Sequence, residues 1–126
     1  MSEVERLVTV VDLDDRDPRG HSAWAHLHAA LRDGKRLVLL NDRGWSSSAA
    51  ITDGGLRDIE GTARMVVGPD GPGPGQTDEQ VETSYWRFLA SKLHDAGIEV
   101  EAGELKRLPH DVEIGERMRS RLIAGA

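Results

Sequence analysis

The stretch that decides the expected fold is residues 7–40, LVTVVDLDDRDPRGHSAWAHLHAALRDGKRLVLL. It opens with the β-branched run Leu7 to Val11, which predicts a buried strand because neither face of the run is polar. It closes with four consecutive apolar residues, Leu37 to Leu40, which predict a second buried strand. The segment between these two strands then determines how they are connected.

That connecting segment carries the spacing of an amphipathic helix. Trp24, Leu27 and Leu31 recur at positions i, i+3 and i+7, which places them on one helical face. Either the Asp-Pro pair at 17–18 or Ser22 supplies the N-cap, and an Asp-Gly pair ends the helix. A strand, a helix and a strand within roughly 35 residues predict a right-handed βαβ unit.

The middle of the chain predicts two helices separated by loops. Residues 41–48 have the composition of a loop, and residues 52–66 fit a helical stripe, although residues 64–67 also fit a short strand. Residues 68–76, GPDGPGPGQ, contain only turn-forming and polar residues and predict an exposed loop. Residues 77–96 then predict a helix that is capped at Thr77 or Asp78 and ends before Gly97.

The C-terminal part predicts a strand at 98–101, a hairpin partner at 104–108 and a last helix that begins at Asp111. The expected order is therefore β-α-β-α-α-β-(β)-α. We expect one layered α/β domain over residues 1–126, with a small, largely parallel sheet and flanking helices.

Composition excludes several classes of function. The chain has no cysteine, so disulfides, thiolate metal sites and thiol nucleophiles are excluded. A net charge of −6 gives no basic surplus for binding nucleic acid, and the longest apolar run, four residues, is too short to span a bilayer. The acidic start lacks a signal peptide, so we expect a cytoplasmic protein, and the residue usage is typical of a GC-rich bacterial genome.

Polar residues follow both predicted strands and define a candidate ligand site. If the strands are parallel, their carboxyl ends share one edge of the sheet, where α/β proteins bind ligands. The candidate residues are Asp12, Asp14, Asn41, Asp42, Trp45 and Ser46. The alternative is that the acids solvate a turn and cap a helix while Trp45 anchors its loop to the core. The five histidines have no metal-binding spacing, so neither a metal nor a cofactor is expected.

Two tryptophans are candidates for binding a partner. Trp86 lies one residue away from the predicted buried stripe of its helix, and Trp45 lies in the predicted loop. An exposed indole in either place is typical of a protein interface, whereas a buried one belongs to the core.

Two functional hypotheses remain. No catalytic motif or nucleophile spacing occurs, which favours a non-catalytic interaction or regulatory module that binds an unknown protein partner or forms a homodimer. The alternative is a ligand-binding or enzymatic domain whose polar site lies at the ends of the first two strands.

Overall fold

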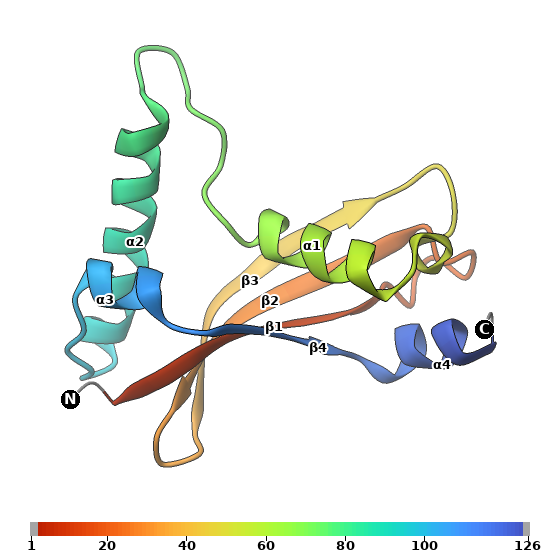
Figure 1. Ribbon diagram of the computed structural model, residues 1–126, viewed down its shortest axis with the longest axis horizontal. Helices are drawn as coiled ribbons and strands as arrows, with labels where there is room; N and C mark the ends of the chain where they lie inside the picture. The colour runs from red at the N-terminus through yellow and green to blue at the C-terminus, as the bar shows by residue number, and fades with distance from the viewer. Residues whose placement is uncertain (1–2, 125–126) are drawn as a thin grey trace.

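The computed structural model describes residues 3–124, and in it the strands come first. β1 (Val4–Leu13), β2 (Ser22–Leu31) and β3 (Arg36–Ser46) form an antiparallel meander. β4 (His110–Ile114) joins the free side of β1 in parallel, which gives the strand order β3-β2-β1-β4 (Figure 1). The sheet is therefore mixed, with β3 and β4 as its edge strands.

The helices follow the meander and flank β4 along the chain. They are a short 3-10 helix η1 (Ile51–Gly54), α1 (Leu56–Val66), α2 (Asp78–Asp95), α3 (Ala102–Arg107) and, after β4, α4 (Glu116–Ala124). In Figure 1, α1 lies across the strands, α2 and α3 lie together at one end of the sheet, and α4 lies at the other end.

All of these helices pack against one face of the sheet. On β1, Leu7, Val11 and Leu13 alternate toward this helix-covered face, and each is buried against helical side chains. The helices contribute buried residues that share two core clusters with these strand residues, namely Ile51, Ile59, Ala63, Leu89, Leu93, Leu105 and Met118. The alternation follows directly from the two-residue period of a strand.

The opposite face carries the remaining side chains of each strand, and we call it the open face. Strand register places Arg6, Val8, Val10 and Asp12 of β1 on it, beside Trp24, His26 and His28 of β2. No helix within residues 3–124 contributes a core residue to this face. Val8 is nevertheless fully buried, although it belongs to neither of the two core clusters.

The predicted helix between the first two strands is wrong, because residues 22–31 form β2. Ala23, Ala25, Leu27 and Ala29 point to the helix-covered face, where each is buried, and Trp24, His26 and His28 point to the open face. The segment therefore has a two-residue period, and the helical spacing of its larger side chains is a coincidence. β2 lies between β1 and β3 and hydrogen-bonds to both of them.

The expected βαβ unit and the largely parallel sheet are therefore also wrong. The chain is an α/β protein, but its first three strands are joined by turns, and only β1 and β4 are parallel. The predicted loop at 41–48 is partly strand, since β3 continues to Ser46. The helix predicted at 52–66 is confirmed from Leu56 onward, while residues 51–54 form η1; the helix at 78–95 is confirmed, and residues 64–66 are helical rather than strand.

The C-terminal expectations need the largest correction. Residues 98–101 form no strand, and residues 102–107 form α3 instead of a hairpin partner. The last helix begins at Glu116 rather than at Asp111, because residues 110–114 pair with β1. None of the helices within residues 3–124 combines the length and the apolar composition needed to cross a membrane.

Candidate functional site

Asp12, the first carboxylate of the predicted ligand site, caps a helix. Its Oδ1 accepts a hydrogen bond from the backbone N–H of Met118 at 2.9 Å, in the first turn of α4. The same oxygen accepts the N–H of Leu13 at 2.8 Å. A carboxylate here also interacts favourably with the positive end of the helix dipole. This structural role accounts for an acid at the end of β1.

The neighbouring acids shape the turn between β1 and β2. Asp14 accepts hydrogen bonds from Nε and Nη2 of Arg16 at 3.0 and 2.8 Å. The Arg16 side chain, together with the Arg16 N–H, lowers the pKa of Asp14 to about 2. Asp17 accepts the N–H of Arg19 and the hydroxyl of Ser22. The cluster is thus held by local hydrogen bonds, and Asp14 lines a cavity of about 520 Å³ between this turn and α4.

The other four residues of the predicted ligand site lie on β3. Asn41 and Asp42 are exposed along the strand, whereas Trp45 is half-buried against the core. Ser46 Oγ lies 3.2 Å from the Ser22 hydroxyl. Trp45 and Ser46 line a cavity of about 320 Å³ beside η1. Asp14 lines a different cavity, because β2 separates β1 from β3.

Within the described part of the chain, no group of three or more His, Asp or Glu side chains is arranged to hold a metal ion.

The two tryptophans proposed as partner anchors pack inward. Trp86 and Trp45 are both half-buried against the core, and the ring of Tyr85 meets that of Trp86 edge-on at 5.0 Å. On α2, Phe88 is a large apolar side chain that faces solvent, and it is 51% exposed. The amine of Lys92 lies 4.9 Å from the centre of the Phe88 ring.

A groove beside β4 gathers exposed apolar side chains. It has a volume of about 540 Å³ and lies between α1, β4 and α4. Its lining residues are Leu56, Glu60, Val112, Glu113, Ile114, Arg119, Leu122 and Ile123. Leu56 is 49% exposed and Ile123 is 70% exposed, although both are large aliphatic residues. We call this surface the β4 groove.

The outer backbone of β4 borders the β4 groove. The N–H of Leu7 donates to the carbonyl of Pro109, and the N–H of Gly115 donates to the carbonyl of Val11. In a parallel pair, alternate residues face the neighbouring strand. Residues 111 and 113 therefore bond to β1, and the backbone groups of His110, Val112 and Ile114 point away from the sheet.

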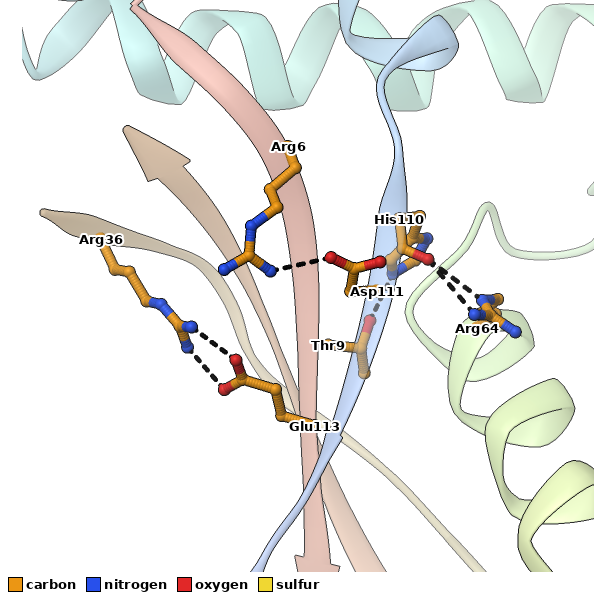
Figure 2. A network of polar contacts seen from close by, with 7 residues as sticks. All are labelled: Arg6, Thr9, Arg36, Arg64, His110, Asp111 and Glu113. Atoms are coloured by element: carbon orange, nitrogen blue, oxygen red, sulfur yellow. Dashed lines mark hydrogen bonds and ion pairs between the residues drawn. The ribbon is translucent and has the colours of Figure 1, made fainter. Parts of the chain in front are cut away.

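Two arginines donate hydrogen bonds to the outward-pointing carbonyls at the two ends of β4. Arg64 of α1 donates from Nε and Nη2 to the carbonyl of His110 at 3.4 and 3.3 Å (Figure 2). Arg119 of α4 donates from Nη2 to the carbonyl of Ile114 at 3.0 Å. Between them, the outward N–H and C=O of Val112 have no hydrogen-bond partner among residues 3–124. The centre of this edge is open and its two ends are capped.

Ion pairs cover part of the open face. Arg36 of β3 donates to both carboxylate oxygens of Glu113 on β4, at 2.8 and 2.6 Å, and Arg6 donates to Asp111 at 2.9 Å (Figure 2). His28 lies near the first pair, and its Nδ1 is enclosed without a partner among the described residues. Burial first, and then the positive charge of Arg36, lower the pKa of His28.

Sequence reasoning missed both the β4 groove and the row of aromatic rings on the open face. Trp24 and His26 have ring centres 4.6 Å apart, and His28 continues the row on β2. The alternation of alanine with these larger residues was a signal for them, because a two-residue period puts all three on one face. The β4 groove had no comparable signal, because its residues come from three separate elements.

In comparisons with known proteins, no protein family, curated protein or solved structure matches the chain.

Proposed function

We propose that this protein is a non-catalytic protein-binding module and that a partner protein docks in the β4 groove. One observation carries the proposal: large aliphatic side chains stay exposed beside an edge strand whose central backbone groups are unpaired. An exposed apolar groove is typical of an interaction site, and an unpaired strand edge is a surface that proteins use to bind extended segments.

The predicted polar site supports binding over catalysis. Asp12 is engaged by the N-terminus of α4, and Asp14 is engaged by Arg16. The pKa of Asp14 is lowered to about 2, whereas a general acid at neutral pH needs a raised pKa. A site for chemistry needs groups whose hydrogen-bonding capacity is directed at a substrate, and these groups are directed at the protein.

The charges beside β4 favour a different protein over a second copy of this chain. A two-fold symmetric pairing of β4 with itself about Val112 would place His110 opposite Ile114 of the second copy. Arg64 and Arg119 cap those two positions, so each end of the pairing would bring two guanidinium groups together. Like charges placed opposite each other in a sheet are destabilising.

A library of displayed random peptides of about 12 residues tests the proposal. Peptides selected on the wild-type protein are expected to bind about tenfold more weakly to Leu56→Gln and to Ile123→Gln, because each variant removes an apolar anchor. Met65→Gln is the matched control, since Met65 is also highly exposed but lies outside the β4 groove. Peptides that bind all three variants equally, or a selection that yields none, would overturn the proposal.

A further inference from the structure

If the proposed function is correct, the residues of the β4 groove also indicate which kind of peptide segment binds there. We infer that the partner presents an extended segment with the pattern acidic-x-apolar-x-acidic, which adds to β4 as an antiparallel strand. The apolar side chain enters the β4 groove, and the two acidic side chains bind Arg64 and Arg119.

The spacing of the pattern comes from the backbone of β4. His110, Val112 and Ile114 all direct their N–H and C=O groups outward. Three residues of an added antiparallel strand would each pair with one of them, at positions i, i+2 and i+4. Side chains at these alternate positions share one face. That face is the helix-covered one, because Val112 and Ile114 pack against the core there.

The acidic positions follow from the two arginines. An added strand must supply N–H donors to the carbonyls of His110 and Ile114, which now accept from Arg64 and Arg119. Both guanidinium groups would then lose their acceptors. Carboxylates at the two ends of the added segment replace those neutral acceptors with charged ones, and charge-assisted hydrogen bonds are the stronger kind. The exchange leaves neither the carbonyls nor the arginines unsatisfied.

The central position must be apolar for two reasons. It pairs with Val112, whose side chain lines the β4 groove together with Leu56 and Ile123. Glu60 lies one helical turn before Arg64 on α1 and also lines the groove. A third acid at the centre would be buried beside apolar side chains and would face the Glu60 carboxylate.

Sequencing the peptides selected on the wild-type protein tests the inference. The expected result is enrichment of acidic residues four positions apart, with an aliphatic or aromatic residue midway between them. For a synthetic peptide from this set, changing either acid to its amide is expected to weaken binding about five- to tenfold, as measured by fluorescence anisotropy.

Arginine variants then assign each acid to its partner. Arg64→Gln and Arg119→Gln are each expected to weaken binding of the peptide with both acids about five- to tenfold. Each variant should weaken binding much less when the acid that pairs with that arginine has already been changed to its amide. Arg57→Gln and Arg117→Gln, exposed arginines on the same two helices, are the controls and should leave binding unchanged. Thermal unfolding of each variant separates loss of binding from loss of fold.

The outcomes separate this inference from the proposed function. If the peptides depend on Leu56 and Ile123 but show no acidic pattern and no dependence on Arg64 or Arg119, the inference is wrong and the docking groove stands. If binding does not depend on Leu56 and Ile123, the proposed function itself is wrong.

Discussion

Arg36 and Glu113 lie on the two edge strands of the sheet, and their side chains meet across the open face over β1 and β2 (Figure 2). The pair is bidentate, with contacts of 2.8 and 2.6 Å. It links the start of β3, the last strand of the meander, to β4, and no turn connects these two strands. Val8, on the central strand β1, is fully buried on this face, and it belongs to neither core cluster that the helices share with the sheet. The ion pair therefore contributes to closing the open face as well as to joining its edges.

Replacing Glu113 with Gln is expected to lower the free energy of unfolding by about 0.5–1 kcal/mol at pH 7, the range for partly exposed ion pairs. The hydrogen bond from Arg36 lowers the pKa of Glu113 below its usual 4.5 in the folded state. The stabilisation is therefore present above pH 4.5 and is lost as the pH falls through the folded-state pKa. Urea unfolding between pH 3 and 7 should show a smaller acid loss for the variant. Glu5→Gln, an exposed control on β1, should change stability at pH 7 by less.

His28 makes folding stability rise with pH. Burial lowers its pKa in the folded state, and the charges of Arg36 and His26 add to this effect while Glu113 opposes it. Between the lowered folded-state pKa and 6.5, the unfolded chain binds more protons, so stability falls as the pH drops below 6.5. His28→Gln is expected to reduce this slope, although His110, whose pKa burial also lowers, retains part of it. A folded-state titration of His28 by NMR with a midpoint at or above 6.5 would contradict this prediction.

How far the sequence predicts the fold is best seen at residues 22–31. Local spacing favoured a helix there, because Trp24, Leu27 and Leu31 match its period. Alanine is a strong helix former, so alternating alanines carry little strand signal of their own. What decides the conformation is pairing with β1 and β3 on both sides, and this is a non-local effect. The helices at 56–66 and 78–95 were predictable because their apolar stripes lie within the segment itself, and the second also has its capping residue, Thr77, next to it.

The same reason explains the C-terminal errors. His110–Ile114 alternates weakly, and an aspartate before a run with helical apolar spacing, as at Asp111, is typical of a helix start. The segment becomes a strand because it pairs with β1, about a hundred residues earlier in the chain. The β4 groove is hard to predict from the sequence for the same reason, since Leu56, Val112 and Ile123 come together only after that pairing forms. Of the predicted ligand site, the sequence located the acidic turn after β1 correctly but placed Asn41 and Asp42 in a loop.

The contact between Thr9 and His110 links β1 to β4 inside the sheet. Thr9 is fully buried, and its Oγ1 lies 2.6 Å from Nε2 of His110 (Figure 2). Thr9→Val keeps the shape but removes the hydroxyl, so the imidazole nitrogen loses its partner, and the expected loss is about 1–2 kcal/mol of unfolding free energy.

A double-mutant cycle isolates that hydrogen bond. In the double variant Thr9→Val/His110→Phe, both polar groups are gone, so the combined loss should be smaller than the sum of the single losses by about 1 kcal/mol. Additive losses in chemical denaturation would show that the two side chains are not coupled.

Asp12 is either a helix cap or a cation ligand, and its variants distinguish these two roles. Its Oδ1 accepts the N–H of Met118 at 2.9 Å, and a Cβ at Gly115 would lie 2.3 Å from its Oδ2, so the carboxylate is seated directly against the start of α4. Asp12→Ala removes the cap and is expected to cost about 1–2 kcal/mol of unfolding free energy. Asp12→Asn keeps an oxygen acceptor at the same place and loses only the charge–dipole interaction, so its cost should be about 0.3–1 kcal/mol.

Thermal unfolding of wild type, Asp12→Asn and Asp12→Ala with and without millimolar Mg²⁺ tests whether Asp12 is a helix cap or a cation ligand. For a cap, the order of stability is wild type, Asn variant, Ala variant, and Mg²⁺ leaves all three melting temperatures unchanged. A wild-type melting temperature that rises with Mg²⁺ and an Asn variant that does not respond would instead assign Asp12 to a cation site.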